Sequence, residues 1–173
     1  MAPPRFQAFI GLGANLGDLR ATLHAALQAL AVAPGQQLLA VSSAWRTAPI
    51  DAGGPDYLNA VCQLETCLAP LELLDLLQAI EQQHGRERPY LNAPRTLDLD
   101  LLFHSAGPLL TERLTLPHPR LHERAFVLAP LDELCPGLPA LFGIDGRPLE
   151  LHRVADQRVE RQGEPLWPLG EGR

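Results

Sequence analysis

The sequence predicts an α+β fold of ferredoxin-like type, a βαββαβ antiparallel sheet with its helices on one face, followed by C-terminal additions. Two observations indicate this class. Four segments have the pattern of strands, two have the 3.6-residue apolar period of helices, and they follow the order strand, helix, strand, strand, helix, strand. The length of 173 residues is typical of one domain, so we expect a single domain over residues 1–162 and a C-terminal tail over residues 163–173.

The first half of the chain supplies three strands and one helix. Residues 6–12 are an apolar run closed by glycines, which is typical of a buried strand. Asp18 can cap the helix that follows, and Pro34-Gly35 ends it. Residues 37–46 and 57–65 have the pattern of two further strands. The inner stripe of the helix should consist of Leu19, Leu23, Ala26, Leu27 and Leu30.

The second helix should begin at Pro70 and end at Gly85. Its inner face should carry Leu71, Leu74, Leu77 and Ile80. Residues 96–103 form the clearest strand of the sequence. Two long loops, 47–56 and 86–95, lie between these elements, and long ordered loops are more often functional than short ones.

The last third of the chain, residues 104–173, is rich in proline and leucine. We expect a short helix near residues 124–133, another near 148–156, and a loose end from about Gly163. The low aromatic content of 5% means that Leu, Ala, Val and Ile must build most of the core.

The charged residues exclude several classes of function. All 14 basic residues are arginine, and lysine is absent. This excludes phosphate-loop ATPases, protein kinases and Schiff-base enzymes, each of which needs a lysine. The net charge of −6 argues against binding to nucleic acid or to an anionic membrane surface, both of which need a basic surface.

The cysteines and the apolar segments indicate the compartment. The three cysteines form no Cys-x-x-Cys pair, so we expect free thiols rather than a zinc site or a disulfide framework. The N-terminus lacks the pattern of a signal peptide, and no apolar segment reaches the roughly 18 residues that a membrane helix needs. We therefore expect a cytoplasmic protein, acting as a monomer.

Two acidic residues interrupt the strand over residues 96–103. The two-residue period of a strand puts Asp98 and Asp100 on one face and the flanking leucines on the other. Two adjacent carboxylates cannot both stay ionised cheaply without a cation, and hard oxygen donors suit Mg²⁺ ions shared with nucleotide phosphates. The alternative is an edge strand with a solvated polar face. Aspartate is rare in strands, which favours the metal site.

Arginines concentrate around this acid pair. Residues 86–124 contain six arginines and five acids, a balance of +1, while the rest of the chain carries −7. Guanidinium groups bind phosphate oxygens in a bidentate manner, so this segment is typical of a polyphosphate pocket. Ordinary surface arginines remain the alternative for Arg88 or Arg120 taken singly. His118, held between two prolines, could donate to a phosphate, although a loop histidine usually has no such role.

Tyr57 and Asn59 begin the strand over residues 57–65 and should face the same way. An aromatic face beside a carboxamide suits a flat heterocycle. The equally open alternative is a tyrosine at the rim of the core and an asparagine that bonds to the strand backbone.

Five motifs together resemble a known family, the hydroxymethyldihydropterin pyrophosphokinases of folate synthesis. They are Gly13-Ala-Asn-Leu-Gly-Asp18, Arg46-Thr-Ala-Pro49, Pro55-Asp-Tyr-Leu-Asn59, Pro94-Arg-Thr-Leu-Asp-Leu-Asp100, and Leu116-Pro-His118 with Arg124-Ala-Phe126. The resemblance covers residues 6 to about 135, and the fourth motif is close to diagnostic. Enzymes of this family move a pyrophosphoryl group from ATP to a pterin alcohol and release AMP.

The resemblance implies a role for each matched position. Asp98 and Asp100 would hold two Mg²⁺ ions, and together with Arg86 and Arg95 of the loop before them they would form the catalytic set. The pterin-binding residues would be Thr47, Pro49, Ile50, Tyr57, Asn59 and Phe126. The ATP-binding residues would be Gln78, Glu81, Arg88, Arg113, Thr115, His118 and Arg124. Residues 86–95 would form a lid over both substrates, ATP and a reduced pterin alcohol.

Two other functions are compatible with the same fold. Another two-metal enzyme, transferring a nucleotidyl group, would release pyrophosphate from ATP instead of AMP. A ferredoxin-like ligand-binding module would have no catalysis, but it would not need paired carboxylates. An RNA-binding function is disfavoured because the predicted sheet lacks paired stacking aromatic residues on a central strand and the chain is acidic.

Overall fold

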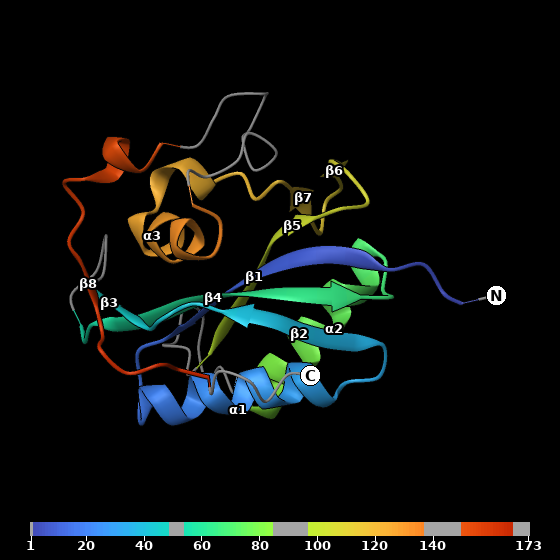
Figure 1. The fold of residues 1–173 in the computed structure, drawn as a ribbon, viewed down its shortest axis with the longest axis horizontal. Coiled ribbons are helices and arrows are strands. Elements are labelled where there is room, and N and C mark those ends of the chain that lie inside the picture. The colour runs from blue at the N-terminus through green and yellow to red at the C-terminus, as the bar shows by residue number, and fades with distance from the viewer. Residues whose placement is uncertain (1, 49–53, 85–96, 137–149, 168–173) are drawn as a thin grey trace.

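The computed structural model describes residues 2–48, 54–84, 97–136 and 150–167 (Figure 1). The strands and the two helices follow one another in the predicted order, except that two strands, β2 and β3, stand where one was predicted, and smaller elements come after them. The elements are β1 (Phe6–Ala14), α1 (Leu19–Val32), β2 (Gln36–Val41), β3 (Trp45–Thr47), β4 (Tyr57–Thr66), α2 (Pro70–Gln83), β5 (Asp98–His104), β6 (Leu109–Leu110), β7 (Thr115–Leu116), the 3₁₀ turn η1 (Leu121–Glu123), α3 (Ala125–Leu134), the 3₁₀ turn η4 (Leu151–Val154) and β8 (Val159–Arg161).

The main sheet is antiparallel throughout. Its strand order is β5-β1-β4-β3-β8, and β2 pairs with the part of β4 that β3 leaves free. This order agrees with the predicted α+β class and is consistent with its ferredoxin-like form. Strands β6 and β7 make a separate two-stranded ribbon.

Helices cover both faces of the sheet. Figure 1 shows α1 and α2 on one face and α3 on the other. One core cluster joins the sheet to α1 and α2 through side chains such as Leu23, Leu27 and Leu77. A second cluster joins the opposite face to α3 through Val61, Leu102 and Leu128. The predicted helix near 124–133 is therefore confirmed as α3, and it adds a third layer that the βαββαβ pattern does not contain.

Helix α1 begins as predicted. The side chain of Asp18 accepts a hydrogen bond from the backbone N–H of Ala21 at 3.1 Å, which satisfies one of the free donors of the first turn. Four of the five predicted inner residues are fully buried, namely Leu23, Ala26, Leu27 and Leu30.

The inner face of α2 differs from the prediction. Leu71 is exposed, whereas Leu73 is fully buried together with Leu77 and Ile80. The true stripe therefore starts two residues later, because the five leucines among residues 71–77 make several stripes compatible with the sequence. Pro70 opens the helix as predicted, and Gly85 lies outside the described residues.

The predicted strand over residues 37–46 is wrong in one respect, because it is split into β2 and β3. At the break, the hydroxyl of Ser42 accepts a hydrogen bond from the backbone N–H of Val61 at 2.9 Å and donates to the carbonyl of Ser43 at 2.8 Å. A side chain thus replaces part of the backbone ladder, a competition for which serine is well suited.

The C-terminal expectations also need correction. Within the described residues, the helix expected near 148–156 is only the short turn η4, and β8 is a strand that the sequence analysis did not predict. The end of the chain after Gly163 is not loose as far as it is described, since Leu166 is buried in the core and Trp167 packs against it. None of the helices in the described ranges is both long and apolar enough to cross a membrane.

The turn between α1 and β2 gives a test of this packing. Gly35 has φ +78°, and a Cβ there would overlap the Sγ of Cys67. Gly35→Ala should therefore lower the free energy of unfolding by about 3 kcal/mol, from left-handed strain plus overlap. Gly17 has nearly the same φ, +75°, with nothing near its missing Cβ. Gly17→Ala should cost only about 1 kcal/mol. Urea unfolding of both variants checks this, and equal losses would contradict the packing at Gly35.

Candidate active site

Strand β5 presents its two acids away from the core. Leu97, Leu99 and Leu101 are buried in the cluster under α1 and α2. Asp98 and Asp100 alternate with them and remain half-buried on the other face, where both line a pocket. The predicted separation of leucines and carboxylates onto opposite faces is therefore confirmed.

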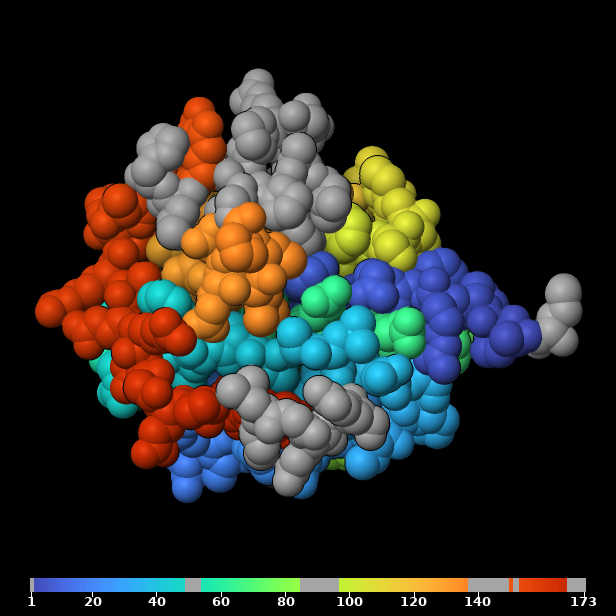
Figure 2. Space-filling model, viewed as in Figure 1, coloured from blue at the N-terminus to red at the C-terminus, as the bar shows by residue number. Residues whose placement is uncertain are grey.

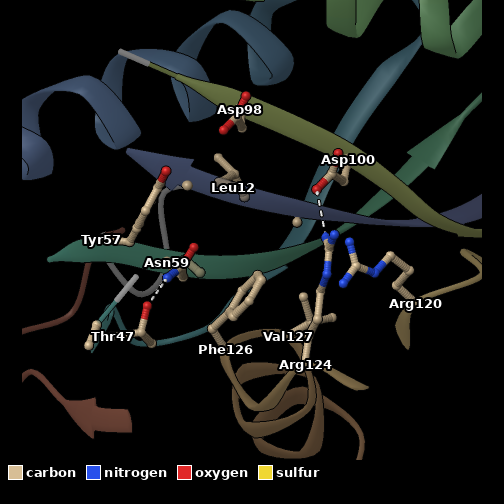
Figure 3. Close-up of a pocket in the computed structure, with 14 residues that line it drawn as sticks. Leu12, Thr47, Tyr57, Asn59, Asp98, Asp100, Arg120, Arg124, Phe126 and Val127 are labelled. Atoms are coloured by element: carbon tan, nitrogen blue, oxygen red, sulfur yellow. Dashed lines mark hydrogen bonds and ion pairs between the residues drawn. The ribbon is translucent and has the colours of Figure 1, made fainter. Parts of the chain in front are cut away.

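The pocket lies between β1, β4 and β5 of the sheet and the start of α3 (Figure 3). Its volume is about 260 Å³, near the lower end of the roughly 300–1,000 Å³ usual for ligand pockets. Figure 3 shows Tyr57 from β4 and Phe126 from α3 entering the same pocket that Asp98 and Asp100 line from β5.

Asn59 and Thr47 form a buried polar pair in the pocket wall. The amide nitrogen of Asn59 donates to the hydroxyl of Thr47 at 2.9 Å. Only 6% of Asn59 and 4% of Thr47 is exposed. A Cβ at Gly13 would lie 2.8 Å from the Oδ1 of Asn59, so only glycine leaves room for the amide in this position. The orientation of the Asn59 amide is thus fixed by Thr47 at its nitrogen and by Gly13 at its oxygen.

Arginines flank the acid pair. The Nη1 of Arg124 lies 3.9 Å from the Oδ2 of Asp100, and its guanidinium carbon lies 5.5 Å from the centroid of the Phe126 ring. Arg124 therefore touches the acid side and the aromatic side of the pocket at once. Arg120 also lines the pocket, whereas the sequence analysis left open whether it binds phosphate or is an ordinary surface arginine.

His118 lies next to the same acid. Its Nδ1 accepts a hydrogen bond from the backbone N–H of Arg120 at 3.2 Å. Burial lowers the pKa of the His118 ring below its usual 6.5, the charge of Asp100 opposes this shift, and Arg124 and Arg120 add to it. The ring is therefore neutral at pH 7, with the proton on Nε2.

Other residues that the resemblance links to ATP lie elsewhere. Arg113 donates to Asp75 at 2.6 Å and to Gln78 at 3.3 Å, at the exposed side of α2. Thr115 is half-buried in β7. The carboxylate of Glu81 is buried and accepts a hydrogen bond at 3.2 Å from the backbone N–H of Leu99. Glu81 thereby ties α2 to the strand that carries the two acids.

Five predicted site residues lie outside the described residues: Pro49, Ile50, Arg86, Arg88 and Arg95. The structure adds lining residues that sequence reasoning missed, chiefly Gly13, Ala48 and Val127. Gly13 had a signal in the sequence, since it opens a motif already noted. Ala48 and Val127 are small or apolar residues that no local pattern distinguishes from core positions.

The residue types at the pocket suit Mg²⁺. This ion is usually held by one or two carboxylates, with substrate phosphates and waters completing its shell. Asp98 and Asp100 supply two such groups at the pocket wall. Among the described residues no cluster of three or more His, Cys, Asp or Glu side chains could hold a metal by itself.

Residues 9–136 match the family model of 7,8-dihydro-6-hydroxymethylpterin-pyrophosphokinase, HPPK. The 2-amino-4-hydroxy-6-hydroxymethyldihydropteridine pyrophosphokinase of Haemophilus influenzae is 44% identical over 132 residues, which cover 76% of this chain and 82% of that protein. The chain belongs to the HPPK family. The enzyme of the same name from Pseudomonas aeruginosa is 44% identical over 133 residues, 76% of this chain and 82% of its own length. The resemblance drawn from the motifs is thereby confirmed, and so is the expectation of a pyrophosphokinase enzyme.

A solved structure supports the fold alone. The HPPK-DHPS of Plasmodium falciparum, crystallised with pterin and p-hydroxybenzoate, matches with a TM-score of 0.67 at 13% identity. The match covers 90% of this chain but only 43% of that one, so this chain spans less than half of the Plasmodium protein.

The charges around His118 give a test of the site geometry. Asp100→Asn removes a neighbouring charge that raises the pKa of His118, so the pKa should fall further. Arg124→Gln removes a charge that lowers it, so the pKa should rise. NMR titration of the ring protons in the free protein measures both shifts. Shifts of the same sign in the two variants would contradict the placement of His118 between these groups.

Proposed function

We propose that this HPPK family member transfers a pyrophosphoryl group from ATP to the hydroxymethyl group of 6-hydroxymethyl-7,8-dihydropterin, giving AMP and the pterin diphosphate, in folate biosynthesis. One observation carries the proposal. A single pocket joins two aromatic rings and a buried amide, which suit a flat heterocycle, to a pair of carboxylates flanked by arginine, which suit a metal-bound triphosphate. The reaction needs both substrates side by side.

The aromatic side of the pocket would bind the pterin. Tyr57 and Phe126 would stack on its ring, and Asn59 would hydrogen-bond its edge. Thr47 would act through its contact with the Asn59 amide at 2.9 Å. The resemblance adds Pro49 and Ile50 to this set.

The acidic side would hold the nucleotide phosphates. Asp98 and Asp100 would bind Mg²⁺, and we retain the count of two ions from the family resemblance. Bound Mg²⁺ would neutralise phosphate charge and polarise the phosphoryl oxygens. Arg124 and His118 adjoin Asp100 and would donate to phosphate oxygens. The resemblance assigns Gln78, Glu81, Arg88, Arg113 and Thr115 to the same substrate.

The chemical step is a displacement at the β-phosphorus of ATP. The hydroxymethyl oxygen forms a bond to this phosphorus, and the bond to the oxygen that bridges to the α-phosphorus breaks. AMP leaves with that oxygen, and the proton of the hydroxyl group is released to solvent with the products. None of the described residues that line the pocket is a strongly activated base. Catalysis would therefore rest on aligning the two substrates and on neutralising the charge of the phosphates.

The remaining parts of the proposal rest on the sequence. Arg86 and Arg95 would be catalytic phosphate ligands on a lid over residues 86–95, which excludes water that would compete with the pterin alcohol. The catalytic domain would span residues 1–162, with a tail over 163–173. The enzyme would act as a cytoplasmic monomer that binds neither nucleic acid nor membranes.

Product analysis tests the reaction directly. The protein is incubated with ATP, Mg²⁺ and the pterin alcohol, and the nucleotide products are separated by ion-exchange chromatography. Formation of AMP that depends on the pterin supports the proposal. Release of free pyrophosphate without a need for pterin would instead indicate nucleotidyl transfer, and pterin binding with no ATP turnover would indicate a binding module.

Asp100→Ala should reduce the rate of AMP formation by about two orders of magnitude or more, because the Mg²⁺ that neutralises the phosphate charge loses one of its carboxylate ligands. The fold should survive, because the Asp100 side chain is 44% exposed. Thermal unfolding checks the fold alongside the rate. Asp156→Ala is the matched control, since Asp156 is exposed in the segment between η4 and β8, away from the pocket lining. Near-normal turnover in the Asp100 variant would overturn the metal assignment.

Gly13→Ala should weaken pterin binding about tenfold, because the new methyl group pushes against the Asn59 amide and disturbs its hydrogen bonds. Gly11→Ala is the comparison on the same strand, because Gly11 also lines the pocket but a Cβ there meets Leu102 at an ordinary 3.5 Å and not Asn59. It separates the push on Asn59 from the mere addition of a methyl group to the pocket lining. Calorimetric titration of pterin into protein saturated with a non-hydrolysable ATP analogue and Mg²⁺ measures both. The assignment of Asn59 to the pterin fails if both variants bind pterin equally well.

A further inference from the structure

A segment beyond the family match supports the pocket wall. The match to the family ends at residue 136. Strand β8, over residues 159–161, pairs with β3, and Val159 lies opposite Thr47 in this pairing. The next backbone N–H, that of Gln162, donates to the carbonyl of Ala44 at 2.8 Å. Without β8, β3 would be an open edge of only three residues, at the lower limit of usual strand lengths, and β4 would be its one partner in the sheet among the described residues.

A polar network holds β8 against two other elements. The Nε of Arg161 donates to the hydroxyl of Ser43 at 3.0 Å and lies 3.4 Å from a carboxylate oxygen of Glu133 in α3. Glu133 also accepts a hydrogen bond from the backbone N–H of Ser43. Arg161 therefore connects β8 and α3 with the break between β2 and β3, two residues before β3 begins.

The segment is fastened again on the far face of the sheet. Arg20 of α1 donates to the backbone carbonyls of Glu164 at 3.0 Å and of Pro165 at 3.2 Å. Leu166 is 5% exposed, and the ring of Trp167 lies 5.2 Å from that of His24. Figure 2 shows this C-terminal segment in red, passing along one side of the molecule from the region of α3 to α1.

We propose that residues 159–167 are a strap that positions Thr47 for pterin recognition, and that Arg161 is a positioning residue in this strap. The inference rests on the proposed function, because it assumes that Asn59 binds the pterin. Thr47 is the last residue of β3, and its hydroxyl accepts the hydrogen bond from the Asn59 amide. The position of β3 therefore sets the direction of the amide. Thr47 and Asn59 are both buried, so water cannot replace their hydrogen bond if β3 shifts slightly.

A strap that only stabilised the fold would behave differently. The Arg161 side chain is 62% exposed, and ion pairs at such positions add little to the free energy of unfolding. A positioning role predicts instead a selective loss of pterin affinity. The nucleotide side of the pocket is built on β5, with which β8 does not pair, and on the start of α3. Arg161 contacts α3 only through Glu133, near the opposite end of the helix, so nucleotide affinity should stay unchanged.

The test compares Arg161→Gln with Arg158→Gln. Arg158 directly precedes the strap, is 84% exposed and forms an ion pair with Glu160, a neighbour within β8, so it serves as the matched control. Calorimetry gives the dissociation constant of the pterin alcohol in the presence of a non-hydrolysable ATP analogue and Mg²⁺, and separately that of the analogue. Thermal unfolding of each variant is recorded alongside.

Arg161→Gln should raise the dissociation constant of the pterin about fivefold, while that of the nucleotide analogue stays within about twofold. Arg158→Gln should change neither. Ser43→Ala removes the hydroxyl that accepts the hydrogen bond from Arg161. The double variant should lose no more pterin affinity than Arg161→Gln alone, because both changes break this same hydrogen bond.

The outcomes separate the two proposals. If the unaltered protein binds no pterin, the proposed function fails. If the unaltered protein binds pterin and Arg161→Gln binds it equally well, the strap inference fails while the function stands. Equal losses of pterin and nucleotide affinity, or additive losses in the double variant, would also overturn the positioning role.

Discussion

The two-residue alternation along β5 is the constraint on which the pocket depends. Burial of Leu97, Leu99 and Leu101 beneath α1 and α2 leaves Asp98 and Asp100 no position other than the opposite face. A shift of one residue would bury two carboxylates and expose three leucines, so the hydrophobic core itself enforces the register. The acid pair is thus placed by core packing rather than by its own interactions. The guanidinium of Arg124, 3.9 Å from Asp100, offsets part of the repulsion between the acids.

The aromatic side of the pocket depends on the third layer. Helix α3 packs on the sheet face opposite α1 and α2, and Phe126 in its first turn faces Tyr57 and Asn59 of β4 across the pocket. The two rings are 69 positions apart in the sequence numbering, from 57 to 126. The ring slot therefore forms only when α3 docks. Arg124, two residues before Phe126 and close to Asp100, links the docking of α3 to the acid pair.

Features set by local sequence could be predicted. The cap at Asp18, the helix start at Pro70 and the faces of β5 each depend on a few neighbouring residues. Features set by distant partners could not. Ser42 divides a continuous strand pattern because its hydroxyl bonds to Val61, nineteen positions later in the chain. Strand β8 has only three residues and exists because β3 offers it an open edge.

The site shows the same division. Asp98, Tyr57 and Asn59 were accessible to sequence reasoning because strand alternation fixes their faces. The contact of Asn59 with Thr47, and the narrow space that Gly13 leaves for the amide, depend on the register between β1, β3 and β4. The register of such pairs is set by the whole sheet, so no pattern within one strand reveals it.

A crystal structure of the enzyme with a non-hydrolysable ATP analogue, Mg²⁺ and the pterin alcohol tests the central claim most directly. The account predicts that the ions lie between the phosphates and the carboxylates of Asp98 and Asp100, with the pterin stacked between Tyr57 and Phe126. Carboxylates that face bulk solvent, with the ions and the nucleotide bound at another surface, would contradict it.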